Sequence, residues 1–144
     1  MARINLALVT AAVLVLLPIR IACAEIVVVV DARSPIQSLS QNDVVNIFMG
    51  RYRLFPGGEL AFPVDQPKGS DVRNEFYRLL IGKSPSEISA YWARLHFSGA
   101  ARQPAQAGDV ADVLTHVLGT RGGIAYLDRS RVDSRVRIVL PLAN

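Results

Sequence analysis

A run of five consecutive β-branched residues, Ile26 to Val30, constrains the fold more than any other feature of the chain. Isoleucine and valine favour strands. Because the run has no polar alternation, neither of its faces suits water, which is typical of a strand buried on both sides. Helices normally cover a sheet of that kind. The run therefore predicts an internal strand of an α/β domain.

Four helices are expected from capping residues that precede apolar stripes with helical spacing. The expected N-caps are Ser40, Ser70, Ser84 and Asp109, and the glycines expected to end the helices are Gly50, Gly82, Gly99 and Gly119. Two of these starts, with Asp43 and Glu87 at N3, have the reciprocal pattern of a capping box. The helix starts are thus predicted more sharply than the strand ends.

Three further strands are expected, over Leu60 to Val64, Ile124 to Leu127 and Val136 to Leu140. Before the first of them, Pro56-Gly57 suits the centre of a type II turn in a hairpin-like excursion. Residues 98–108 are small and polar, which is typical of a surface loop. The predicted order is β-α-β-α-α-α-β-β, a two-layer or three-layer α/β domain with a sheet flanked by helices.

The first 24 residues have the pattern of a signal peptide. Arg3 precedes an apolar run from Leu6 to Leu17, and Ala22-Cys23-Ala24 offers a cleavage site before Glu25. The run is shorter than the roughly 20 residues that span a bilayer, so cleavage is favoured over an N-terminal anchor. Lipidation of Cys23 stays open, although Arg20 stands where a lipobox has leucine. We expect a soluble protein exported to the periplasm.

The charge and cysteine content exclude several classes of protein. Removal of residues 1–24 takes away Arg3 and Arg20 and no acid, so the net charge falls from +4 to +2. This balance does not favour nucleic acid or an anionic membrane as a partner. The single cysteine leaves with the signal or becomes its lipid anchor, so no disulfide within the chain is expected. Residues 25–144 suffice for one domain but not for two well-packed lobes.

Catalytic and metal-binding patterns are absent from the sequence. His96 and His116 have no second ligand at helical spacing other than acids, so we expect no metal site. No G-x-S-x-G element occurs, and loss of Cys23 removes any cysteine–histidine pair. We therefore expect neither an enzyme nor a cofactor.

The helix start at "KGSDVR", Lys68 to Arg73, is the best candidate binding site. It follows a predicted strand, where α/β folds bind anions on unpaired backbone N–H groups. Arg73 occupies N3, where a cation opposes the helix dipole but could neutralise a bound anion. The alternative is a plain N-cap, with Arg73 on a solvated face and Asp71 restoring the dipole balance. The sequence pattern leaves both interpretations open.

Three stretches of the chain resemble one known family. They are "LSQNDVVNIFMGRYRLFPGG", "PVDQPKGSDVRNEFYRLLIGKSPSEISAYWARLHFSG" and "RGGIAYLD". They are similar to short phosphate ABC transporter substrate-binding-like proteins, a type-2 periplasmic-binding-protein-like family. The resemblance covers roughly residues 25 to 130 and implies a mixed sheet flanked by helices. It also implies an exported protein that binds phosphate or a similar small oxyanion, as part of a phosphate-type ABC uptake system.

The resemblance also implies a set of ligand-binding residues around the helix start. In the family pattern an arginine lies four residues before the serine and Gly-Thr follows it, whereas this chain has Gln66, Asp71 and Val72 at those positions. We expect the side chains of Ser70 and Arg73 to bind the anion. The expected set is completed by backbone donors at Gly69, Asp71 and Val72, and by Gln66 and Lys68 at the rim.

The chain length implies a single lobe, since full-size binding proteins close two lobes over their ligand. A half-site of this kind would bind weakly or be completed by a homodimer, a membrane transporter or an envelope protein. The alternative function is an envelope protein-interaction module that retains one lobe. Its expected contacts are the exposed sheet edge or the corner Arg51-Tyr52-Arg53.

Overall fold

The computed structural model describes residues 24–143. The predicted signal peptide, apart from Ala24, and the fate of Cys23 therefore lie outside the described residues. Among residues 24–143, no helix has both the length and the apolarity that crossing a membrane would need.

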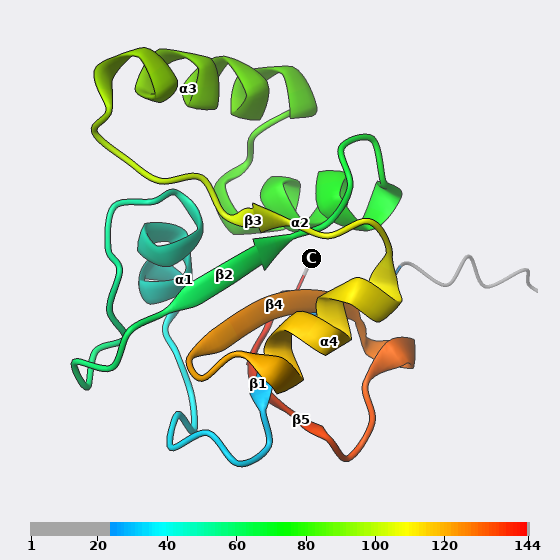
Figure 1. The fold of residues 1–144 in the computed structure, drawn as a ribbon. Helices are drawn as coiled ribbons and strands as arrows, with labels where there is room; N and C mark the ends of the chain where they lie inside the picture. Colours follow the sequence, from blue (N-terminus) through cyan, green and yellow to red (C-terminus); the bar gives the residue numbers. More distant parts are fainter. Residues whose placement is uncertain (1–23, 144) are drawn as a thin grey trace, which may run out of the picture.

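A five-stranded mixed sheet forms the centre of the domain (Figure 1). Its strands are β1 (Ile26–Asp31), β2 (Phe62–Asp65), β3 (Ala105–Gln106), β4 (Gly123–Asp128) and β5 (Val136–Pro141), in the spatial order β3-β2-β4-β1-β5. Strand β1 is antiparallel to both β4 and β5, whereas β2 is parallel to β3 and β4. Residues Ile26 to Val30 are at most 1% exposed, so the predicted internal strand is confirmed.

The four expected helices are present with the expected N-caps. They are α1 (Gln41–Phe48), α2 (Asp71–Ile81), α3 (Pro85–Ser98) and α4 (Val110–Gly119), and a short 3₁₀ turn, η1 (Arg129–Arg131), follows β4. Both predicted capping boxes, at Ser40 and Ser84, are formed. Helices α2 and α3 end at left-handed glycines, Gly82 and Gly99. Local capping chemistry thus set these boundaries.

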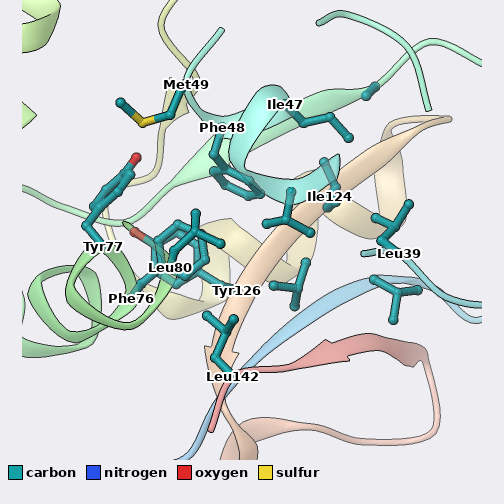
Figure 2. Close-up of a cluster of buried hydrophobic side chains, with 14 of the residues drawn as sticks. Leu39, Ile47, Phe48, Met49, Phe76, Tyr77, Leu80, Ile124, Tyr126 and Leu142 are labelled. Atoms are coloured by element: carbon teal, nitrogen blue, oxygen red, sulfur yellow. The ribbon is translucent and has the colours of Figure 1, made fainter. Parts of the chain in front are cut away.

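The domain has three layers, because each face of the sheet buries a separate apolar core. Along β1, Ile26, Val28 and Val30 join the core beneath α1, α2 and α3. The alternate residues Val27 and Val29 join the core beneath α4 on the opposite face. Figure 2 shows part of the larger core, where the rings of Phe76 and Tyr126 stack with centroids 3.7 Å apart. The choice between two and three layers is therefore settled by α4.

The excursion before β2 differs from the prediction in its turn and in its strand boundary. The Gly58 N–H donates to the Phe55 carbonyl at 2.9 Å, so Pro56 and Gly57 do occupy the central positions. The positive φ, however, falls on Gly58 and not on Gly57, so the type II prediction is wrong. Strand β2 begins at Phe62 and not at residue 60, because pairing with β4 starts only there.

The predicted surface loop over residues 98–108 contains strand β3. Ala105 and Gln106 pair in parallel with Val64 and Asp65 at the end of β2. Both β3 residues are exposed, so neither leaves an apolar pattern that sequence reasoning could detect. The pairing nevertheless brings residues 102–106 beside β2.

Gly122, directly before β4, should be the hardest glycine to replace. It has φ +81°, and an added Cβ would collide with the Leu60 carbonyl. We expect Gly122→Ala to lower the free energy of unfolding by roughly 2–6 kcal/mol, measured by denaturant titration. Gly57→Ala is the matched control, because nothing lies within 4 Å of its added Cβ, and it should change stability by no more than about 0.5 kcal/mol. Equal effects of the two substitutions would contradict this account.

Candidate functional site

A tight turn delivers the chain from β2 into α2. The Ser70 N–H donates to the Pro67 carbonyl at 3.1 Å, and Gly69 supplies the positive φ of 84° that the third position of a type II turn requires. Ser70 is the N-cap, and its hydroxyl oxygen accepts from the backbone N–H of Arg73 at 3.2 Å. The predicted helix start is therefore confirmed.

Two backbone donors at this start remain unpaired within the described residues. The first N–H groups of a helix have no partner in the helix itself. Here the N–H groups of Asp71 and Val72 donate to no other described residue, whereas that of Arg73 is bound by Ser70. They present partial positive charge at a place exposed enough for a guest to reach.

Arg73 lies inside the protein, so the alternative interpretation, which placed it on a solvated face, is wrong. It is only 3% exposed, and its Nε donates to Asp65 Oδ2 at 2.9 Å. Its guanidinium also lies 5.0 Å from the centre of the Tyr77 ring. A carboxylate at the end of β2 therefore already balances the cation that opposes the α2 dipole.

Asp65 is the centre of a buried polar cluster that joins three elements. Besides Arg73 of α2, its carboxylate accepts from the Tyr77 hydroxyl of the same helix at 3.1 Å and from the Tyr126 hydroxyl of β4. The Tyr126 oxygen in turn accepts from the backbone N–H of Gln66 at 3.1 Å. Three donors thus satisfy a carboxylate that is 1% exposed, as a buried charge requires.

Gln66 does not lie at the rim of the site, and that expectation is wrong. The residue is 3% exposed, and its amide nitrogen donates to the Tyr126 carbonyl at 2.9 Å. Its own carbonyl accepts from the Gln106 amide of β3 at 3.3 Å. Gln66 directly follows β2. Its side chain is hydrogen-bonded to β4 and its carbonyl to β3, so both are already paired within the sheet.

A cavity of about 320 Å³ opens between the start of α2 and helix α3. Its walls are Lys68, Arg73, Ser89, Trp92, Ala93, His96, Phe97 and Gln103. No carboxylate is among these lining residues, whereas ammonium, guanidinium, imidazole, amide and hydroxyl groups are. Trp92 is 7% exposed, and its indole N–H donates to no described residue. The cavity is therefore rich in donors and has an excess of positive charge.

The structure divides the predicted site residues between different surroundings. Lys68 and Arg73 share the cavity, whereas Asp71 and Val72 border a separate groove with Asn74, Glu75 and the start of α3. Sequence reasoning missed the α3 side of the cavity, because an apolar residue such as Trp92 at helical spacing is typical of a buried core stripe rather than of a binding site. The contact between α3 and Lys68 depends on how two helices pack, so no local pattern indicates it.

Among residues 24–143, no group of three or more histidine, cysteine, aspartate or glutamate side chains is arranged to hold a metal ion.

No protein-family model matches the chain. No curated protein matches it either.

Solved structures do match the chain, over 80% of its length in each case. One is assigned as a phosphate ABC transporter substrate-binding protein from Clostridium perfringens, with bound phosphate (17% identity, TM-score 0.63). Another is an ABC-type phosphate transport receptor from Vibrio cholerae (17%, 0.64). A third is described as a candidate phosphate-binding protein from Planctomyces limnophilus DSM 3776 (12%, 0.59).

The chain has a phosphate-binding-protein-like fold. It spans 44%, 45% and 40% of the three matched chains, so it corresponds to a single lobe. The predicted fold class, one α/β lobe with a mixed sheet and flanking helices, is confirmed. At these identities the likeness concerns the fold, and the neighbours it identifies are named as binding proteins rather than enzymes.

Asp65→Asn should be strongly destabilising in this phosphate-binding-protein-like lobe. The substitution keeps the shape of the side chain but leaves the guanidinium of Arg73 buried without a counter-ion. We expect the free energy of unfolding to fall by about 3–5 kcal/mol in denaturant titrations. Asp71→Asn is the matched control, because Asp71 is exposed in the first turn of α2 and should cost no more than about 1 kcal/mol. Similar losses in both variants would refute the role given to Asp65.

The buried tyrosines should make the protein sensitive to alkali. Burial, and then the negative charge of Asp65, raise the pKa of Tyr77 and of Tyr126 well above the ordinary value of about 10. Above that pH the unfolded chain loses these protons while the folded chain keeps them, so the free energy of unfolding should fall. The loss should reach about 1.4 kcal/mol per pH unit for each tyrosine. Tyr77→Phe should make this decline shallower, and an unchanged slope would count against the account.

Proposed function

We propose that the chain is an exported, non-catalytic binding protein for phosphate or a similar small oxyanion. The observation that carries this proposal is the cavity beside the start of α2. Lys68 and Arg73 meet there among further donors and without a carboxylate in the lining. The fold shared with proteins named as phosphate binders supports the same assignment.

The cation of Arg73 would be presented to the anion in a fixed orientation. Its Nε is bound to Asp65, whereas its two Nη atoms have no hydrogen bond to another described residue. A guanidinium is planar and carries donors along more than one edge, so the remaining edge can bind an oxyanion. Lys68 is exposed and adds a second, movable charge.

The helix start would add backbone donors next to the cavity, on the side of the neighbouring groove that Asp71 and Val72 border. Gly69 and Ser70 form the turn, and the unpaired N–H groups of Asp71 and Val72 follow it. Gln66 supports this turn from inside the sheet rather than touching the anion. The Asp71 carboxylate carries negative charge in the first turn, so singly charged oxyanions should bind better than dianions.

A single lobe leaves one side of the anion open to water, which weakens polar contacts. We propose that a second copy of the chain, a membrane transporter or an envelope protein completes the site. In this proposal the protein serves a phosphate-type ABC uptake system, and the periplasm is its place of action.

Lys68→Ala should weaken phosphate binding about tenfold, since it removes one charged donor from the cavity. Trp92 is the only tryptophan of the chain and lines this cavity, so its fluorescence can follow the titration, with calorimetry as a second readout. Lys83→Ala makes the same change in net charge at the other end of α2 and should leave the affinity unchanged. Equal affinities of all three proteins, or no binding of phosphate and sulfate at all, would refute the assignment.

The role of Arg73 needs a paired substitution. Arg73→Glu would place a second carboxylate beside buried Asp65, so loss of folding would obscure loss of binding. The double variant Asp65→Asn/Arg73→Gln removes both charges together, and replacing a whole buried pair is often tolerated. We expect it to fold, as judged by circular dichroism, and to lose oxyanion binding.

A further inference from the structure

A second groove, of about 480 Å³, lies on the other side of segment 102–104, next to the beginning of β2. In Figure 1 the excursion between α1 and β2 runs along one side of this region, and the chain leading into β3 runs along the other. The lining of the groove includes Tyr52, Arg53, Leu60, Phe62, Arg102 and His116. Lys68 and Arg73, the cations of the oxyanion cavity, are not among them.

The walls of this groove carry an unusual share of the exposed apolar surface. Tyr52, Leu60 and Phe62 are 61%, 52% and 43% exposed, and they are three of the five large hydrophobic residues that are exposed in residues 24–143. Removing such side chains from water is favourable by roughly 25 cal/mol for each Å² covered. The groove therefore favours a guest with an apolar body.

Two arginines of the groove are cations without an ion-pair partner among the described residues. Arg53 and Arg102 form no ion pair with another described residue, and no aspartate or glutamate lines the groove. Among the other exposed arginines, Arg33, Arg121, Arg129 and Arg135 each have a carboxylate partner within 3.1 Å, whereas Arg51, Arg94 and Arg131 form no ion pair with another described residue. The Nε2 of His116 lies 3.1 Å from the Phe62 carbonyl, to which it must donate, because a carbonyl oxygen only accepts.

We propose that this groove binds a small organic anion that has an aromatic or branched apolar body and one carboxylate or similar acidic group. Tyr52, Leu60 and Phe62 cover the body, and Arg53 and Arg102 hold the charge. The volume lies within the range of about 300–1,000 Å³ that is typical of small-molecule sites. An inorganic oxyanion would leave the apolar walls in water, so this ligand class differs from that of the cavity beside α2. Tyr52 and Arg53, two residues of the corner expected as a protein contact, thereby acquire a small-molecule role.

The test uses 2-naphthoate as the probe and the neutral 2-naphthalenemethanol as its uncharged counterpart, with the purified protein. Calorimetry measures affinity, and amide chemical shifts of Arg53, Phe62 and Ala105 locate the bound probe. We expect saturable binding of the naphthoate, with binding of the alcohol at least about tenfold weaker because it lacks the charged hydrogen bonds.

Two matched double variants separate the proposed site from general charge. Arg53→Gln/Arg102→Gln should weaken naphthoate binding about tenfold or more, whereas Arg51→Gln/Arg94→Gln removes the same charge outside the groove and should not. Tyr52→Ser, at an exposed position, should also weaken it. Thermal unfolding followed by circular dichroism confirms that each variant is folded.

Competition with inorganic phosphate distinguishes this site from the oxyanion cavity. Phosphate should not displace the naphthoate, and Lys68→Ala should leave naphthoate binding unchanged even if phosphate binding fails entirely. The proposal is overturned if the alcohol binds as well as the acid, if the two double variants bind alike, if phosphate displaces the probe or if the naphthoate does not bind.

Discussion

The buried ion pair between Asp65 and Arg73 is the interaction on which the other polar features of this lobe depend. Arg73 alone would be costly, because a cation at N3 opposes the helix dipole and burial removes its hydration. Asp65 alone would be equally costly at the end of β2. Together, and with hydroxyl donors from Tyr77 and Tyr126, they satisfy one another and fasten α2 to β2 and β4. The start of α2 is thereby fixed in position while its first amides stay unpaired.

In the proposed function, the same ion pair also determines how Arg73 is presented to an anion. Because Asp65 partly neutralises its charge, the Arg73 guanidinium would contribute mainly directed hydrogen bonds. We therefore expect the site to discriminate between anions by their shape and protonation state while binding them only moderately. Helix α3 adds the facing wall, with Lys68 the one mobile cation among the lining groups described. In the groove next to segment 102–104 the charges are arranged differently. Arg53 and Arg102 lie beside apolar walls, and no carboxylate lines the groove to neutralise them. In our two proposals, the lobe therefore has one site for a compact anion and one for an amphipathic anion.

Much of the fold could be predicted because its determinants are local in the chain. The capping box at Ser84 and Glu87 involves residues three apart in sequence. The strand at Ile26 to Val30 is predicted by its own run of β-branched residues. The prediction of secondary structure failed where an element depends on residues far away in the chain, or on residues without a distinctive local pattern. Strand β3 consists of two exposed residues, and the turn at Gly58 depends on which of two adjacent glycines takes the positive φ. Of the residues around the candidate cavity, Lys68 and Arg73 were expected from the sequence, whereas the wall formed by α3 was not.

The sequence by itself determined the helices, their caps, the internal strand and the place where α2 begins. These features depend on short-range hydrogen bonds and on apolar periodicity, and both involve residues that are close together in the chain. Only the tertiary structure decided that Arg73 is buried, that Gln66 belongs to the sheet and that Trp92 faces the same cavity as Lys68. Those outcomes depend on Tyr126, 61 residues from Asp65 in sequence, and on the packing of α3. A side chain's charge is fixed by its identity, but its availability to a ligand is fixed by the distant groups that fold against it.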